Sequence, residues 1–213
     1  MTDSTPQSIA IWGAAGHARV VADALGLVGR FSLAGFIDDV MPQRRGEAFC
    51  GSRILGGHEV LADLHSAGVR YMALAFGQNE ARLRLADELK AQGFELPVIV
   101  HPNAVIARDA VIGEGSYIGV FAVVNAAARL GRAVIVNSGA IVEHDSVLGD
   151  GVHISPRACL AGNVHVGRAS WIGAGAVVKD RVHIGAGATV GMGAVVIRPV
   201  PDGVTVVGCP AAQ

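Results

Sequence analysis

The sequence from Asn137 to Gly162, NSGAIVEHDSVLGDGVHISPRACLAG, has an aliphatic residue at every sixth position. The same spacing continues on both sides and gives sixteen consecutive positions that are all Ile, Leu or Val: Ile106, Ile112, Ile118, Val124, Leu130, Val136, Val142, Leu148, Ile154, Leu160, Val166, Ile172, Val178, Ile184, Val190 and Val196. The residue four places after each of these is Ala, Ser or Val. This double hexapeptide period predicts a parallel β-helix, in which each coil stacks on the last and the aliphatic side chains point inward.

The residues before this repeat have a different pattern of apolar residues. Residues 8–29, SIAIWGAAGHARVVADALGLVG, read as a strand, a glycine turn and a helix. Further strands are expected at 33–39, 71–77 and 96–102, and an amphipathic helix at 79–93. Alternating strands and helices predict a small parallel sheet of Rossmann type. We therefore expect a Rossmann-like domain over residues 1–101 and a β-helix domain over residues 102–213.

Composition narrows the possible functions of the 213 residues. Hydrophobic residues make up 51% of the chain, and 17 Lys and Arg stand against 18 Asp and Glu, which favours a globular protein without a nucleic-acid footprint. No apolar run reaches the roughly 18 residues of a membrane span, and the polar opening MTDSTPQ lacks the features of a secretion signal. The three cysteines match neither a disulfide framework nor a zinc motif. We expect a cytoplasmic protein with no metal and no nucleic-acid or membrane partner.

The glycine turn and the end of the second strand form the first candidate site. Gly13, Gly16 and His17 in GAAGH stand where a phosphate-binding turn would lie, and its backbone N–H groups could hold a diphosphate. Asp38 and Asp39 follow the second strand, where an acid can bind a ribose hydroxyl or a base edge. The turn departs from the Gly-x-Gly-x-x-Gly fingerprint, so a tight turn without a ligand is the alternative. The two features together favour a nucleotide.

The second candidate site is the Glu143-His144-Asp145 run inside the repeat. These residues follow the inward Val142 and therefore lie outside the core or at a corner of the coil. A neutral imidazole is a common general base near pH 7, and an adjacent carboxylate can fix its tautomer and stabilise the imidazolium. A solvated charged corner is the alternative reading.

Taken together, the stretch 137–162, the hexads, IAIWGAAGHARVV at 9–21 and GFIDD at 35–39 resemble the bacterial acetyltransferases that modify nucleotide-activated sugars. This is the group of sialic-acid O-acetyltransferases and of bacillosamine and perosamine N-acetyltransferases. The resemblance covers nearly the whole chain. It implies that a Rossmann-like domain holds the nucleotide sugar, and that a left-handed β-helix forms a homotrimer and binds acetyl-CoA between subunits.

The resemblance also implies roles for single residues. His144 would be the catalytic base and Asp145 its orienting acid, with Glu143 as the other candidate carboxylate. Asn137 would contact the sugar amine, and Gly162, one 18-residue coil after His144, would steady the thioester oxyanion through its N–H. The implied acetyl-CoA site comprises Gly162 together with His153, a second active-site histidine, and Gly173, Ala174, Gly208 and Pro210. The family often has Gly or Ser near Ala15 and Ala18, which is a departure in the diphosphate turn.

We therefore predict an acetyl-CoA-dependent N-acetyltransferase that acts on a UDP- or GDP-linked 4-amino sugar, with GDP-perosamine as the specific expectation. A sugar O-acetyltransferase on the same fold is the nearest alternative. A zinc hydratase would need three gathered histidines; His165 and His183 are 18 residues apart and stack on one column, but no two histidines lie about five residues apart. A non-catalytic solenoid is the last alternative. Apolar residues at outward places, including Val147, Trp171 and Val177, favour a trimer that covers them.

Overall fold

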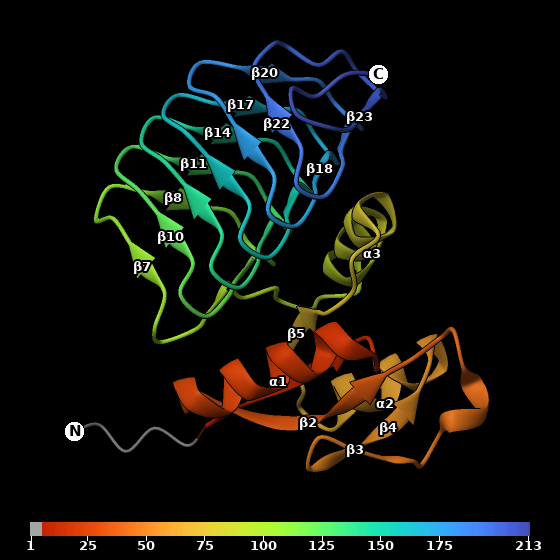
Figure 1. Ribbon diagram of the computed structural model, residues 1–213. Helices are drawn as coiled ribbons and strands as arrows, with labels where there is room; N and C mark the ends of the chain where they lie inside the picture. Colours follow the sequence, from red (N-terminus) through yellow and green to blue (C-terminus); the bar gives the residue numbers. More distant parts are fainter. Residues whose placement is uncertain (1–5) are drawn as a thin grey trace.

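The structure is a computed structural model that describes residues 6–213, so the first five residues of the polar opening segment lie outside the described part. An N-terminal α/β unit lies below a left-handed β-helix, and the helix α3 (Asn79–Ala91) stands beside the coils (Figure 1). Both predicted architectures are confirmed.

The N-terminal unit is built on a five-stranded sheet with the order β3-β4-β2-β1-β5. Its strands are β1 (Gln7–Trp12), β2 (Phe31–Ile37), β3 (Ala48–Phe49), β4 (Ser52–Gly56) and β5 (Tyr71–Leu74). Neighbours run parallel except for the β3–β4 hairpin. The other helices are α1 (Gly16–Val28), α2 (Leu61–Ser66) and the short 3-10 helices η1 (Pro42–Arg44) and η2 (His58–Val60). The parallel strands β1, β2 and β5 end at one edge, where the glycine turn and the two acids lie.

Local sequence explains the limits of the long helices. Helix α1 buries residues at helical spacing, namely Ala18, Val21, Ala24 and Leu25. It ends where Gly29 adopts the left-handed conformation and donates its N–H to the Leu25 carbonyl. In α3, the leucines Leu83, Leu85 and Leu89 are all buried.

The β-helix consists of two-residue strands that pair in parallel with strands one coil away in three sheets. One sheet contains β7 (Val105–Ile106), β10 (Val123–Val124), β13 (Ile141–Val142), β16 (Cys159–Leu160), β19 (Val177–Val178) and β22 (Val195–Val196). The second contains β8 (Val111–Ile112), β11 (Arg129–Leu130), β14 (Val147–Leu148), β17 (His165–Val166) and β20 (His183–Ile184). The third contains β6 (Ile99–Val100), β9 (Tyr117–Ile118), β12 (Ile135–Val136), β15 (His153–Ile154), β18 (Trp171–Ile172), β21 (Thr189–Val190) and β23 (Thr205–Val206). Every predicted inward residue from Ile118 to Val196 is buried.

Three columns of turns form the corners of the triangular coils. The first column, called the His144 corner, includes 125–127, 143–145, 161–163 and 179–181. The α3 corner includes 113–115, 131–133, 149–151 and 167–169, and the Asn137 corner includes 119–121, 137–139, 155–157, 173–175 and 191–193.

The strand expected at 96–102 does not join the N-terminal sheet, which corrects that prediction. Ile99 and Val100 form β6, which pairs with β9 of the β-helix. Val100 stands six residues before Ile106 and thus extends the hexapeptide period by one step. The N–H groups of Ile99 and His101 donate to the carbonyls of Ser116 and Ile118 in the next coil. Because the backbone of this segment is hydrogen-bonded in this way, the strand extends the solenoid instead.

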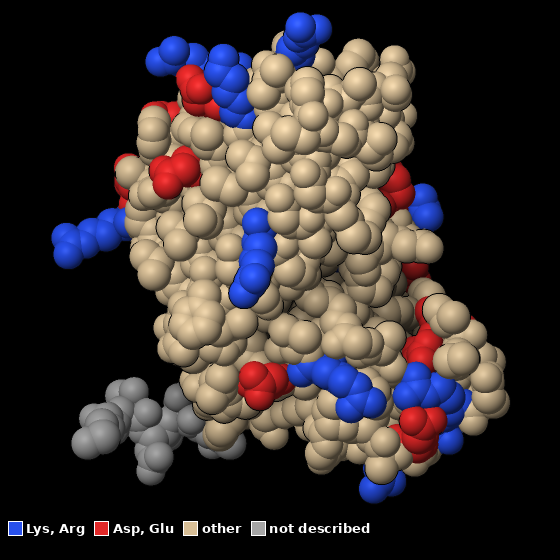
Figure 2. All heavy atoms as spheres, viewed as in Figure 1, with Lys and Arg blue, Asp and Glu red and all other residues tan. Residues whose placement is uncertain are grey.

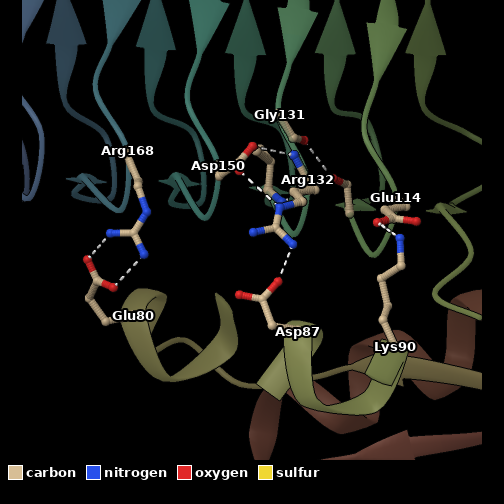
Figure 3. Close-up of polar contacts among 10 residues, drawn as sticks. Glu80, Asp87, Lys90, Glu114, Gly131, Arg132, Asp150 and Arg168 are labelled. Atoms are coloured by element: carbon tan, nitrogen blue, oxygen red, sulfur yellow. Dashed lines mark hydrogen bonds and ion pairs between the residues drawn. The ribbon is translucent and has the colours of Figure 1, made fainter. Parts of the chain in front are cut away.

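Helix α3 docks on the α3 corner through a row of ion pairs (Figure 3). The pairs are Glu80–Arg168, Asp87–Arg132 and Lys90–Glu114. Arg168 and Arg132 are two 18-residue coils apart, and Glu114 is one coil further. Coils stack at about 4.8 Å, and an α-helix rises about 1.5 Å per residue, so three coils span roughly the ten residues from Glu80 to Lys90. The spacing of charges on the helix therefore matches the spacing of the coils.

One sheet of the β-helix presents an apolar outer face. Its outward residues are Val105, Val123, Ile141, Cys159, Val177 and Val195. Figure 2 shows few charged side chains on the face that carries β7, β10 and β22. Trp171 lies in the third sheet, where its indole N–H donates to the Ser155 hydroxyl at 2.6 Å and its ring is half-buried. Within one chain the apolar face has no cover among the described residues.

Candidate active site

His144 and Asp145 form a close pair at the His144 corner. The imidazole Nδ1 lies 2.8 Å from Asp145 Oδ2, and both side chains are 60% exposed. Asp145 reaches the ring because its backbone adopts a left-handed conformation with φ of 61°. An ionised carboxylate only accepts hydrogen bonds, so this contact puts the imidazole proton on Nδ1 and leaves the Nε2 lone pair free. Nε2 is thus able to accept a proton.

Glu143 faces a different part of this turn. Its Oε2 accepts the His144 backbone N–H at 3.3 Å and the Asn125 side-chain amide at 2.9 Å. The carboxylate of Glu143 therefore contacts the backbone of His144, while that of Asp145 contacts its ring. The turn at 179–181 of the same corner also carries three charged residues. The feature that distinguishes the turn at 143–145 is therefore its imidazole and not its charge.

Gly162 lies against the ring of His144. A Cβ atom at Gly162 would come within 2.6 Å of both Cε1 and Nε2 of the imidazole. The backbone N–H groups of Gly162 and of Asp180, one coil later, have no acceptor among residues 6–213, whereas the N–H groups of Ala126 and His144 at the same corner are bound by side chains. A pocket of about 260 Å³ opens here, lined by His144, Asp145, Gly162, Asn163, Asp180 and Arg181. It places the His144 imidazole and the Gly162 N–H side by side.

Asn137 and His153 lie together, but not beside His144. Asn137 belongs to the Asn137 corner, and His153 begins β15 on the sheet that leads to that corner. The Ser138 N–H donates to Asn137 Oδ1 at 2.8 Å, which turns the amide nitrogen toward His153 Nε2 at 3.3 Å. Since an amide nitrogen only donates, Nε2 accepts this bond and the ring is neutral. Within one chain, the expected catalytic residues are thus divided between two corners.

Burial and charge act on two histidines at the junction of the two units. Burial, the positive charge of Arg82 and the neighbouring His17 lower the pKa of His153 to about 3. Burial and then Arg82 lower the pKa of His17 to about 4. His17 packs edge to face on Tyr117, with ring centroids 5.2 Å apart, and its Nε2 is buried without a hydrogen-bond partner among the described residues. His17 thus faces the β-helix.

A pocket of about 550 Å³ opens at the carboxyl ends of β1, β2 and β5. Of the five residues expected to bind the nucleotide, Gly13, Asp38 and Asp39 line it, and Gly16 and His17 do not. Gly13 is required by the fold, since its φ is 119° and a Cβ atom would lie 2.6 Å from the Ala75 carbonyl oxygen. Other lining residues are Trp12, Arg44, His58, Phe76, Gln78, Arg84 and Glu88.

The carboxylates of Asp38 and Asp39 are already bound within the protein. Asp38 Oδ1 accepts the N–H groups of Val40 and Met41, and Oδ2 pairs with Arg44 at 3.3 Å. Asp39 accepts the His58 backbone N–H at 2.8 Å and pairs with its ring nitrogen Nδ1 at 2.7 Å. Both acids shape the pocket wall.

The remaining candidates lie higher on the β-helix. Gly173 and Ala174 are at the Asn137 corner, two coils after Asn137, and a Cβ atom at Gly173 would meet the Met192 backbone N at 2.6 Å. Gly208 and Pro210 follow β23, and the Gly208 carbonyl accepts the Val195 N–H at 3.0 Å. These residues lie on a different corner from Gly162.

His165 and His183 are neighbours on β17 and β20, with ring centroids 6.4 Å apart. Within residues 6–213 no third His, Cys, Asp or Glu joins them in a group that could hold a metal ion. The same residues include no helix of the length and apolarity that a membrane crossing requires.

Two family models match this chain. Residues 8–89 match the PglD N-terminal domain, and residues 163–198 match the bacterial transferase hexapeptide repeat. The acetyltransferase domain of PglB from Neisseria gonorrhoeae FA1090, solved with acetyl coenzyme A, is 38% identical, with a TM-score of 0.92 over 98% of this chain and 100% of that one. This chain belongs to the bacterial hexapeptide-repeat nucleotide-sugar acetyltransferases.

Two further members of this family are similar to the chain. A histidine-to-asparagine mutant of perosamine N-acetyltransferase from Caulobacter crescentus, solved with CoA and GDP-perosamine, is 35% identical, with a TM-score of 0.92 over 96% of this chain and 95% of that one. The UDP-N-acetylbacillosamine N-acetyltransferase of Bacillus subtilis (strain 168) is 36% identical over 115 residues. This last match spans about half of each chain, 53% of this one and 51% of the relative.

Sequence reasoning missed several residues at the large pocket and at the junction of the two units. Arg44 and His58 line the large pocket and contact Asp38 and Asp39, respectively, and no short sequence motif predicts these contacts. Arg82 had a readable signal, because it stands on the apolar stripe of α3 seven residues before Leu89, a position where a charged side chain is unusual.

Proposed function

We propose that the protein transfers the acetyl group of acetyl-CoA to the amine of a 4-amino sugar linked to UDP or GDP, with GDP-perosamine as the specific candidate. The observation that carries this proposal is the pairing of His144 and Asp145 beside the free N–H of Gly162. Family members similar over nearly their whole length were solved with acetyl coenzyme A, or with CoA and GDP-perosamine, which supports both substrates.

The proposed reaction needs one base and one oxyanion donor. The sugar amine attacks the thioester carbonyl carbon, and His144 Nε2 accepts the proton that the amine loses. The negative charge on the carbonyl oxygen is stabilised by the N–H of Gly162. When the carbon–sulfur bond breaks, the imidazolium can return its proton to the CoA thiolate, which restores the neutral ring. Asp145 stabilises the imidazolium in between.

The large pocket at the strand ends is the proposed nucleotide site. Its volume of about 550 Å³ falls within the range of small-molecule pockets. It combines the aromatic rings of Trp12 and Phe76 with polar groups of Gln78 and Arg84. Arg84 forms no ion pair with any residue in the described range 6–213, so its charge is available to a diphosphate.

The division of the catalytic candidates supports a trimer. His144 and Gly162 are at one corner, while Asn137, Gly173 and Ala174 are at another. In a ring of three subunits, the His144 corner of one chain can face the Asn137 corner of the next, and the apolar sheet with Val177 can be covered.

The proposed function is tested by incubating purified protein with acetyl-CoA and a panel of UDP- and GDP-linked 4-amino sugars, each matched with its 4-hydroxy analogue. Mass spectrometry should detect a gain of one acetyl group on an amino sugar together with free CoA. Acetylation of the hydroxy sugars alone would identify an O-acetyltransferase, and no turnover on any acceptor would reject the proposal.

A further inference from the structure

Arg82 is a buried cation without a carboxylate partner. Its side chain on α3 is 0% exposed, and no Asp or Glu of residues 6–213 pairs with it. The guanidinium instead donates to the carbonyls of Ala133 at 2.9 Å, Gly151 at 2.8 Å and Phe76 at 3.1 Å. It also donates to Asn79 Oδ1 at 3.1 Å. A buried charge held only by neutral oxygens costs free energy that a packed apolar side chain would avoid.

The three carbonyls belong to the segments that present Asn137 and His153. Ala133 ends the turn before β12, and β12 leads directly to Asn137. Gly151 occupies the equivalent place one coil later, two residues before His153. Phe76 precedes Gly77, whose Cβ position would lie 3.8 Å from Nδ1 of the His153 ring. One side chain therefore holds the two strands and the loop that surround the Asn137–His153 pair.

The same pair depends on a neutral imidazole. The Asn137 amide nitrogen donates to His153 Nε2. A proton on Nε2 would turn this atom into a donor as well, and the hydrogen bond would be lost. The titratable or charged groups that act on His153 are Arg82 from α3 and His17 from α1, and no carboxylate is among them. Burial lowers the pKa of His153 first, and the Arg82 charge lowers it further.

We propose that Arg82 is a positioning residue, which fixes the Asn137–His153 pair through three backbone carbonyls and, together with burial, keeps the His153 ring neutral through its unpaired charge. The catalytic meaning of this arrangement rests on the proposed function, in which Asn137 and His153 belong to the acetyl-transfer site. The effect on His153 itself does not depend on it, so the two can be tested separately.

The test compares Arg82→Met, which removes the charge, with Arg82→Lys, which keeps it but offers fewer and differently placed donors. Nitrogen-15 NMR of the imidazoles between pH 4 and 8 reports protonation of His153 without any substrate. We expect a largely neutral ring throughout in the parent protein and in Arg82→Lys, because the pKa of His153 is about 3. In Arg82→Met the ring should be about half protonated near pH 4, since loss of a neighbouring charge shifts a pKa by about one unit or more.

The kinetic arm uses Arg168→Met as the matched control. Arg168 joins the same helix to the same corner by an exposed ion pair with Glu80, but it has no hydrogen bond to the segments around His153. We expect kcat to fall about tenfold or more in Arg82→Met, with a new loss of rate at acid pH, and to fall less in Arg82→Lys. Arg168→Met should keep the parent kcat and pH profile.

An unchanged His153 ring in Arg82→Met would overturn the electrostatic role, whatever the activity. Equal kcat in Arg82→Met and Arg168→Met would overturn the positioning role. If Arg82→Met does not fold, the Lys variant decides: a neutral His153 with reduced kcat supports the proposal, and a parent-like kcat or a protonated ring rejects it. Failure of the parent protein to acetylate any nucleotide sugar would reject the proposed function and leave the NMR result valid.

Discussion

A methyl group on Gly162 would lie 2.6 Å from Cε1 and Nε2 of His144, one coil below it. Such a distance is too short for carbon against carbon or nitrogen, so one partner must move. The His144 side chain is 60% exposed and can rotate into solvent, whereas the coil backbone cannot yield as easily. The glycine therefore keeps the imidazole in the position where it meets Asp145.

Gly162→Ala should displace the ring of His144 and lower kcat by about a hundredfold, because both the proposed base and the proposed oxyanion donor lose their alignment. The thermal midpoint should change little. The control is Gly26→Ala on α1, where an added Cβ atom meets nothing within 4 Å. Parent-like turnover by Gly162→Ala would show that the contact has no role in catalysis.

His144→Ala should lower kcat by about a hundredfold or more and leave the fold intact, because the side chain is exposed and general-base contributions reach that size. Asp145→Asn should cost less, since asparagine tolerates the left-handed backbone of that position and disturbs only orientation and charge. Glu143→Gln serves as the comparison. A far larger loss in Glu143→Gln than in Asp145→Asn would reverse the choice of carboxylate. All three variants are compared by steady-state kinetics and circular dichroism.

Stability should fall as the pH drops from about 6.5 toward 4. The unfolded chain binds protons at His17 and His153 near the ordinary pKa of 6.5, whereas the native protein binds them only near about 4 and about 3. Since the unfolded state then holds more protons, each histidine reduces the free energy of unfolding by at most about 1.4 kcal/mol per pH unit in this window. Urea denaturation at stepped pH measures the slope.

In the same experiment His153→Gln removes one of the two titrating groups, so its stability should depend less steeply on pH below 6.5. A variant slope equal to that of the parent protein would mean that His153 is protonated in the native state or exposed to solvent.

The apolar sheet should form a subunit interface. Val177 is 43% exposed in the single chain, and Val177→Glu should convert the proposed trimer to smaller species because it places a charge on the apolar face that the trimer would cover. Light scattering should report three chains for the parent protein. A stable and active monomer would contradict the trimer.

Mixed trimers test whether each site uses two chains. His144→Ala and Asn137→Ala subunits, each inactive alone, should recover about one quarter of parent activity when refolded together, because random mixing unites an intact His144 corner with an intact Asn137 corner at that frequency. Unmixed samples treated identically are the control. No recovery would mean that a single chain supplies both residues.

Asp38→Ala should raise KM for the nucleotide sugar severalfold and leave KM for acetyl-CoA nearly unchanged. The carboxylate holds the loop at 38–44 through the N–H groups of Val40 and Met41 and through Arg44, so its loss disorders one wall of the large pocket. Asp63→Ala, at an exposed acid on α2, is the control. A weakened acetyl-CoA interaction would reject the division of binding between the two units.

The sequence alone predicts the β-helix, because the inward residue recurs every six positions and a one-residue slip would expose the whole core. It also determined that Gly162 stands above His144, since 18 residues complete one coil. The Rossmann-type sheet and α3 followed from local periodicity in the same way. These features are encoded by neighbours in the chain.

How the two units meet, and which residues share a site, could not be predicted without the three-dimensional structure. In the structure the strand at 99–100 belongs to the solenoid instead of the N-terminal sheet, His17 packs on Tyr117, and Asp38 and Asp39 are bound within the pocket wall. It also buried Arg82 against carbonyls 51 and 69 residues away in the chain. Such contacts depend on the docking of segments that are distant in the chain, and no periodic pattern specifies how these segments lie relative to each other. For the same reason, the placement of His144 and Asn137 at different corners could be seen only in the folded coils.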